Sequence, residues 1–221
     1  MTLTPSRAPA LPTPLYVILD RSASRGRELP EVLEAVLQGG GRVVQLRDKE
    51  RSPVDLYPLA RQLRSRCREA GCLFIVNDRV DLALAVEADG VHVGQDDFPA
   101  RAARRLLGPG MILGVSTHDL GQARAARDDG ADYVAVGSMF PTGSKPGFQL
   151  VGPQLLRAVR PEIAVPLVAI GGITVDNVGE VVRAGADAVA IISAVCAAPD
   201  PAEATRSFLE RITRARKDSS R

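Results

Sequence analysis

The stretch GADYVAV (130–136) recurs as GADAVAI (185–191), and ADGVHV (88–93) is a close variant. In the first two, a glycine that can take the left-handed conformation stops a helix after an acidic or alanine-rich turn. A short loop then leads into an apolar run of strand length. This pattern predicts buried parallel strands that alternate with helices.

The same alternation extends outward over nearly the whole chain. Eight apolar runs have the length of strands: 15–20, 42–47, 72–77, 90–93, 111–115, 133–136, 166–170 and 188–192. Helical patterns occupy 54–70, 120–129, 175–184 and 201–216. Eight strand–helix units within about 200 residues predict the α/β class and a (β/α)8 TIM barrel. An open doubly wound sheet is the main alternative, but no glycine-rich dinucleotide motif follows the first run.

The 221 residues suit a single domain. Residues 1–14 carry four prolines and little pattern, so they are predicted to form a loose N-terminal arm. The catalytic barrel is expected over 15–216, with a C-terminal tail over 217–221.

Composition excludes several classes of protein. The content of 45% hydrophobic and 24% charged residues is ordinary for a soluble globular domain. A net charge of +2, with both signs mixed along the chain, gives no reason to expect a nucleic-acid surface. No apolar run approaches the roughly 20 residues of a membrane span, and no signal peptide is evident. The three cysteines are too scattered for a disulfide framework or a zinc site, and Cys72 and Cys196 are expected in the core. A cytoplasmic protein is predicted.

Function in a TIM barrel lies at the carboxyl ends of the strands. After the second run, Gln45, Arg47 and Lys49 occupy alternate positions, which a strand turns to one side. Two cations beside an amide suit a clamp for phosphate oxygens, although a solvated strand end explains them equally well.

Acidic residues follow the next two runs: Asp78 after Asn77, and Asp96 and Asp97 after Gln95. Carboxylates from two neighbouring strands suit Mg²⁺ that is shared with substrate phosphates. Helix capping accounts for one aspartate at each place, but two such places on one rim favour the metal. His92, within the fourth run, is expected to be a core residue or to support the site from behind.

The later strand ends carry hydroxyls and glycines. After the fifth run, Ser116 and His118 could contact phosphate and titrate near neutral pH, with helix capping by Ser116 or Thr117 an equal alternative. The long loop after the sixth run fits a lid that closes over an anion, and it contains Thr142, Ser144 and Lys145. Gly171, Gly172 and Ser193 follow the last two runs, where this fold often binds phosphate.

Two anion sites and a metal, without a dinucleotide motif, indicate a substitution in which pyrophosphate leaves. In order along the chain, QLRDK (45–49), NDRVDLA (77–83), GVHVGQDD (90–97), GVSTH (114–118), PTGSK (141–145), AIGGI (169–173) and IISA (191–194) resemble the thiamine phosphate synthase family. The resemblance covers nearly the whole chain after the arm. One difference is the loop sequence Thr142-Gly143-Ser144-Lys145, where the family often has Thr-x-Thr-Lys; serine keeps the hydroxyl.

The resemblance implies that two phosphorylated small molecules, a hydroxymethylpyrimidine pyrophosphate and a hydroxyethylthiazole phosphate or its carboxylate, combine by dissociative substitution. It implies that the pyrimidine pyrophosphate contacts Gln45, Arg47, Lys49, Asn77, Ser116 and Lys145. Of these, Arg47, Lys49, Ser116 and Lys145 would be catalytic. It implies Mg²⁺ on Asp78 and Asp97. It implies that the thiazole phosphate contacts Thr142, Ser144, Gly172, Ile192 and Ser193.

Three other functions are weighed against this one. A thiazole tautomerase-like barrel would use His118 for proton transfer, but it needs neither the QLRDK clamp nor Mg²⁺. A non-catalytic barrel that senses a phosphorylated metabolite would bind without forming product. A phosphosugar isomerase would need a clearer acidic base at the barrel centre. Assembly into a homo-oligomer is left open.

Overall fold

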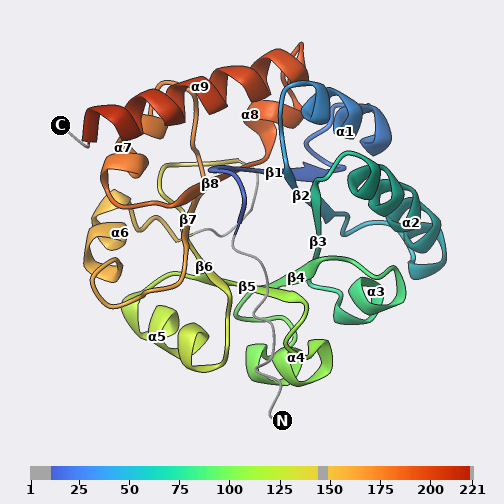
Figure 1. Ribbon diagram of the computed structural model, residues 1–221, viewed down its shortest axis with the longest axis horizontal. Coiled ribbons are helices and arrows are strands. Elements are labelled where there is room, and N and C mark those ends of the chain that lie inside the picture. The colour runs from blue at the N-terminus through green and yellow to red at the C-terminus, as the bar shows by residue number, and fades with distance from the viewer. Residues whose placement is uncertain (1–10, 144–148, 220–221) are drawn as a thin grey trace, which may run out of the picture.

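The computed structural model describes residues 11–143 and 149–219. Eight parallel strands form a closed barrel in which each strand pairs with the next and β8 pairs with β1 (Figure 1). The strands are β1 (Leu15–Asp20), β2 (Val43–Arg47), β3 (Leu73–Asn77), β4 (Gly90–Val93), β5 (Ile112–Thr117), β6 (Tyr133–Val136), β7 (Leu167–Ile170) and β8 (Ala188–Ile191). The predicted (β/α)8 barrel is confirmed, and the doubly wound sheet is excluded.

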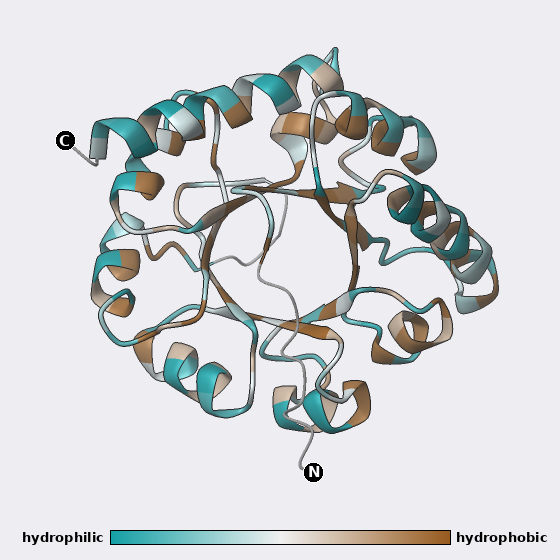
Figure 2. Cartoon of the chain, in the orientation of Figure 1, coloured by the Kyte–Doolittle hydropathy of each residue, from teal (hydrophilic) through white to brown (hydrophobic). Residues whose placement is uncertain are grey.

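Helices surround the barrel, with hydrophobic strands inside and mainly hydrophilic outer helix faces (Figure 2). They are α1 (Leu29–Gln38), α2 (Pro53–Glu69), α3 (Val80–Ala85), α4 (Ala100–Leu107), α5 (Leu120–Asp128), α6 (Pro153–Val159), α7 (Val178–Arg183), α8 (Ser193–Cys196) and α9 (Pro201–Ser219). No helix in the described part of the chain is long and apolar enough to cross a membrane.

Two predicted helix boundaries differ from the structure by three residues each, whereas the strand boundaries differ by at most two. Helix α9 continues to Ser219, so the expected tail from 217 begins too early. Helix α7 begins at Val178 instead of 175, because the preceding residues form a turn. In that turn Thr174 N–H donates to Asn177 Oδ1 at 2.8 Å.

The described end of the predicted loose arm is attached to the barrel. The Val189 N–H donates to the Pro14 carbonyl at 2.8 Å, and Leu11 packs against the apolar residues inside the barrel. Residues 1–10 of the predicted arm lie outside the described residues. The arm therefore lies against the barrel at least from residue 11.

The apolar core has two layers. The larger layer lies between the strands and the helices, and it contains all three cysteines, as expected for Cys72 and Cys196. The smaller layer fills the inside of the barrel, where Tyr16 and Tyr133 are the largest side chains and each is 1% exposed. The barrel is thus a packed core, and ligands must bind at its rim.

The aspartates of the opening motifs have one shared role. Asp89, Asp132 and Asp187 stand just before β4, β6 and β8, and each carboxylate accepts a 2.8 Å hydrogen bond from a backbone N–H near the start of the preceding strand. Each carboxylate also pairs with an arginine from the helix, or its C-cap, that comes before that preceding strand: Arg64, Arg104 and Arg160, respectively. We call these three residues the strand-start aspartates. They join neighbouring strands at the amino end of the barrel.

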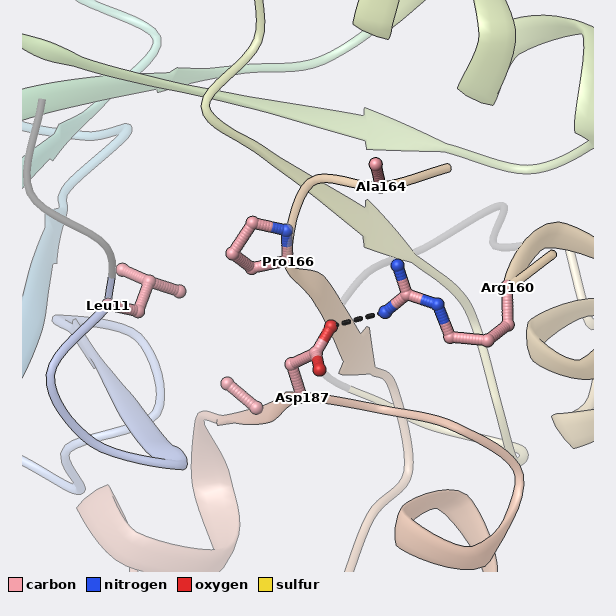
Figure 3. A pocket seen from close by; sticks show the side chains of 6 residues that line it. Leu11, Arg160, Ala164, Pro166 and Asp187 are labelled. Atoms are coloured by element: carbon pink, nitrogen blue, oxygen red, sulfur yellow. Dashed lines mark hydrogen bonds and ion pairs between the residues drawn. The ribbon is translucent and has the colours of Figure 1, made fainter. Parts of the chain in front are cut away.

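Figure 3 shows one of these pairs, Arg160 with Asp187, beside a shallow hollow at the amino ends of β7 and β8. Leu11 and Pro166 also border this hollow. Its charged groups already neutralise one another, so it offers no unpaired charge to a ligand.

Candidate active site

A cavity of about 440 Å³ opens at the carboxyl ends of the strands. All the predicted site residues that the structure describes line it: Gln45, Arg47, Lys49, Asn77, Asp78, Asp97, Ser116, Thr142, Gly172, Ile192 and Ser193. Ser144 and Lys145 lie outside the described residues. A volume of this size suits small organic ligands. The predicted residues therefore meet in one place, although they come from seven strand ends.

Strand β2 supplies the cationic side of the cavity. Gln45 is buried at 2% exposure, and Arg47 pairs with Asp20, its register partner on β1. Asp20 is itself buried and also accepts hydrogen bonds from Ser22 Oγ (2.5 Å) and the Ala23 N–H (3.1 Å). The carboxylate thus fixes the direction of the guanidinium. Asp20 ends the first predicted strand, and it is a positioning residue that the sequence analysis did not single out.

Asp78 and Asp97 come together at the ends of β3 and β4. Lys49 Nζ lies 3.1 Å from Asp78 Oδ2, and Asp97 Oδ2 accepts the Gly94 N–H at 2.8 Å. Burial and the nearby Asp97 carboxyl raise the pKa of Asp78, while Lys49 opposes that shift. Asp78 has a φ of 61°, a left-handed conformation that is uncommon outside glycine.

The alternative that these polar residues merely cap helices is not supported for Asp78 or Ser116. Helix α3 has Arg79 at its N-cap with no side-chain cap bond, so Asp78 does not cap it. Helix α5 is capped by Asp119, which accepts the Gln122 N–H at 2.8 Å. Both site residues are therefore available to the cavity.

Metal binding at this rim would involve only two protein carboxylates. Over residues 11–143 and 149–219, no three His, Cys, Asp or Glu side chains gather into a metal-binding cluster. Asp97 is partly buried, whereas its neighbour Asp96 is exposed. Two carboxylate oxygens are too few to enclose a metal ion, but they match a Mg²⁺ ion completed by water and substrate phosphate.

Ser116 is reached from inside the barrel by a buried hydrogen-bond chain. His92 Nε2 lies 2.8 Å from Ser116 Oγ, and His92 Nδ1 lies 2.9 Å from the Tyr133 hydroxyl. Tyr133 lies 3.0 Å from the Tyr16 hydroxyl, to which Gln45 Nε2 donates at 2.6 Å. His92 is 6% exposed, which confirms the expected core or supporting role. Burial raises the pKa values of both tyrosines, so they remain protonated.

Hydroxyl and backbone groups form the opposite side of the cavity. The loop after β6 is tied at both described ends, because the Ser138 N–H donates to the Gln149 carbonyl at 3.0 Å. Gly172 has a φ of 64°, and a Cβ there would lie 2.4 Å from the Pro141 carbonyl oxygen. The loop after β6 therefore packs directly against the Gly172 backbone, and it brings Thr142 to the cavity.

His118 is fixed by two contacts at the cavity wall. Its Nδ1 donates to the Gly137 carbonyl at 2.6 Å, and its backbone N–H donates to Gln122 Oε1 at 2.7 Å. The ring thus has a structural role in joining β5 to β6.

Sequence reasoning missed four further contributors: Asp20, Tyr16, Tyr133 and Ser138. Asp20 carried a visible signal, an acidic residue at a strand end. The two tyrosines carried none, because an apolar run with a tyrosine is equally typical of a core strand.

Comparison with known proteins identifies the family. A family model described as thiamine monophosphate synthase matches residues 15–195. The thiamine-phosphate synthase of Moorella thermoacetica is 50% identical over 203 residues, covering 91% of this chain and 97% of its own. That of Chloroflexus aurantiacus is 51% identical over 195 residues, covering 88% and 90%. The structure of thiamine phosphate pyrophosphorylase from Pyrococcus furiosus superposes with a TM-score of 0.84 at 38% identity, covering 91% and 96%. This chain belongs to the thiamine monophosphate synthase family.

Proposed function

We propose that this cavity joins a hydroxymethylpyrimidine pyrophosphate to a hydroxyethylthiazole phosphate, or its carboxylate, and releases thiamine phosphate and pyrophosphate. The observation that carries the proposal is the division of one cavity into two unlike sides. One side has cations and carboxylates, and the other has hydroxyls and backbone. Such a cavity suits a pyrophosphate and a phosphomonoester side by side.

The pyrimidine pyrophosphate belongs on the β2–β5 side. Arg47 and Lys49 neutralise its charge, and the planar guanidinium can contact two oxygens at once. Gln45, Asn77 and Ser116 add hydrogen bonds from neighbouring strand ends. Lys145, from the loop after β6, is assigned to the same group by family resemblance alone.

Mg²⁺ fits Asp78 and Asp97, whose carboxylates come together although each alone prefers water. The raised pKa of Asp78 reflects that crowding, and a divalent cation would relieve it. When bound, Mg²⁺ supplies positive charge against the pyrophosphate, where negative charge grows as it departs. Lys49, at 3.1 Å from Asp78, would turn from this carboxylate toward the pyrophosphate once the metal is present.

The thiazole phosphate belongs on the β6–β8 side. Thr142 and Ser193 offer hydroxyls, and Gly172 and Ile192 offer backbone at the same wall. Ser144 is added by family resemblance. This is also the wall where barrels of this type often bind phosphate.

Apolar side chains complete the cavity between these two sides. Ile18, Ile170 and Ile191 line it and offer surface to flat rings. The substitution begins with departure of pyrophosphate, which leaves a pyrimidine methyl cation. The thiazole nitrogen then attacks that carbon. Apolar walls would keep water from trapping the cation, and no protein nucleophile is needed.

The test is to incubate the purified protein with both substrates and Mg²⁺, and to follow thiamine phosphate and pyrophosphate by mass spectrometry. Equal formation of both products, lost on chelation and restored by added Mg²⁺, is expected. Asp97→Asn should abolish turnover, whereas the control Asp81→Asn, which changes an exposed carboxylate on α3 outside the cavity, should retain it. Turnover that survives chelation would contradict the metal assignment, and binding without product would favour the sensor.

A thiazole tautomerase has less support, because the cationic and carboxylate side of the cavity has no task in that reaction. A cytoplasmic location and a homo-oligomeric state stay predictions.

A further inference from the structure

We propose that a buried hydrogen-bond chain from Gln45 to Ser116 runs in one direction and leaves the Ser116 hydroxyl hydrogen facing the cavity. Tyr133 and His92 are then the positioning residues that keep Ser116 a donor to an anionic oxygen, and Tyr16 connects them to Gln45. The link to catalysis rests on the proposed contact between Ser116 and the pyrophosphate. The direction of the hydrogen-bond chain does not depend on that contact.

The direction follows from counting hydrogens. Gln45 Nε2 donates to the Tyr16 hydroxyl at 2.6 Å. Tyr16 has one hydroxyl hydrogen, which goes to its other partner, Tyr133, at 3.0 Å. The hydroxyl hydrogen of Tyr133 then goes to His92 Nδ1 at 2.9 Å.

An imidazole nitrogen that accepts a hydrogen bond carries no hydrogen of its own. The neutral ring of His92 therefore carries its hydrogen on Nε2 and donates it to Ser116 Oγ at 2.8 Å. A doubly protonated ring would place a hydrogen on Nδ1 against the hydroxyl hydrogen of Tyr133. The Ser116 oxygen thus accepts from within the barrel, and its own hydrogen is left for the cavity.

The opposite direction would give the opposite chemistry. If Gln45 accepted from Tyr16, each later hydrogen would reverse, and Ser116 would donate to His92. Its lone pairs would then face the cavity and repel a pyrophosphate oxygen. Only the first direction matches the cations Arg47 and Lys49, which line the same cavity.

Packing holds the chain in place. The Tyr133 ring stacks on His92 with centroids 5.5 Å apart and meets Tyr16 edge-on at 5.9 Å. Gly114 provides the space, because a Cβ there would lie 2.0 Å from Tyr133 Cζ. The five side chains from Gln45 to Ser116 come from β1, β2, β4, β5 and β6, so the hydrogen-bond chain crosses the inside of the barrel.

The experiment reads the hydrogen positions directly. Two-bond ¹H–¹⁵N NMR on the ¹⁵N-histidine-labelled, ligand-free protein distinguishes the two neutral tautomers from the imidazolium. The chain has two histidines, and a His118→Gln variant identifies the signals of His92. His92 is expected as the Nε2–H tautomer. The Nδ1–H tautomer, or an imidazolium at neutral pH, would overturn the proposal.

Two matched variants test the order of the chain. Tyr133→Phe removes the donor to His92 Nδ1 and should produce a mixture of tautomers. Tyr16→Phe removes an equivalent hydroxyl one step earlier and leaves Tyr133 to donate, so the Nε2–H tautomer should persist. An unchanged tautomer in Tyr133→Phe would contradict the proposed order. Phenylalanine keeps both rings and their packing.

Kinetics then link the chain to the reaction. Tyr133→Phe should lower kcat/KM for the pyrimidine pyrophosphate about five- to tenfold, the usual weight of one hydrogen bond, and leave the KM for thiazole phosphate unchanged. Tyr16→Phe should change kcat/KM less than about twofold, since the bond to His92 remains. Equal losses in both variants would indicate general damage and overturn the positioning role. The predicted tautomers in a protein that forms no thiamine phosphate would support the chain and refute the proposed function.

Discussion

Replacing Asp20 by asparagine tests how strongly the end of β1 depends on a carboxylate. In the native side chain, Oδ1 accepts from Ser22 Oγ and the Ala23 N–H, while Oδ2 accepts from Arg47. Asparagine has one accepting oxygen and presents an N–H₂ group on the other side. Either the Ala23 N–H or the Arg47 guanidinium would therefore face this N–H₂ group and lose its hydrogen-bond acceptor.

The expected cost has two parts. A buried N–H left without an acceptor costs about 1–3 kcal/mol. Loss of the charge on Asp20 adds roughly 1 kcal/mol, because the Arg47 side chain, 18% exposed, can still be partly hydrated. The total is about 3 kcal/mol, and in a domain of this size that lowers the Tm by about 6–12 °C.

The assay is thermal unfolding of the ligand-free protein by circular dichroism, checked by urea denaturation for an unchanged m-value. The control is Asp81→Asn, which removes an exposed ion pair with Arg79 and should move the Tm by less than about 2 °C. A Tm for Asp20→Asn within that same range would refute the reasoning. It would mean that the end of β1 rearranges without cost.

Three further predictions concern the cavity and the inside of the barrel. Asp78→Asn should lower Mg²⁺-dependent turnover by more than about 100-fold and leave the fold intact, because asparagine tolerates the left-handed backbone but lacks the charge. Steady-state kinetics measure the turnover and circular dichroism checks the fold. Near-native turnover would remove Asp78 from the metal site. The pKa of Asp78 is raised by burial and by Asp97, so its ionised form opposes folding at neutral pH and that cost disappears as the pH falls through the raised pKa. In metal-free buffer, Asp78→Asn should therefore raise the Tm at pH 7 but not in acid, and a pH-independent difference would contradict the shift. Gly114→Ala should destabilise the protein by about 2 kcal/mol by forcing Tyr133 to move, as urea denaturation can measure, and native stability would show that the inner layer has unused space.

Most of the fold could be predicted from the sequence because its signals are local. Strand-length apolar runs and the glycine stops after α5 and α7 place the strands within a residue or two of their observed positions. Two helix boundaries were predicted wrongly. The turn closed by Thr174 and Asn177 makes α7 begin later than predicted, and α9 continues to Ser219. The attachment of Leu11 and Pro14 depends on contacts with distant β8, which no local pattern reveals.

The candidate site was predictable to the extent that it follows strand ends. Gln45, Arg47 and Lys49 lie on one side because a strand alternates, and Asp78 and Asp97 meet because neighbouring strands end together. The sequence could not indicate which buried side chains hold these site residues in position. Asp20 holds Arg47 because β1 and β2 bring these two residues into register, and Tyr133 meets Tyr16 because the closed barrel brings β6 across from β1.

The strand-start aspartates separate the two ends of this molecule. The same hydrogen bond from a backbone N–H to an aspartate recurs before β4, β6 and β8, whereas the carboxyl ends of the eight strands carry eight different sets of side chains. In a random-mutagenesis library, variants that unfold should gather at the repeated end and variants that fold but lose activity should gather at the irregular one. A molecule built in this way can explore new chemistry at one rim while the other maintains the scaffold.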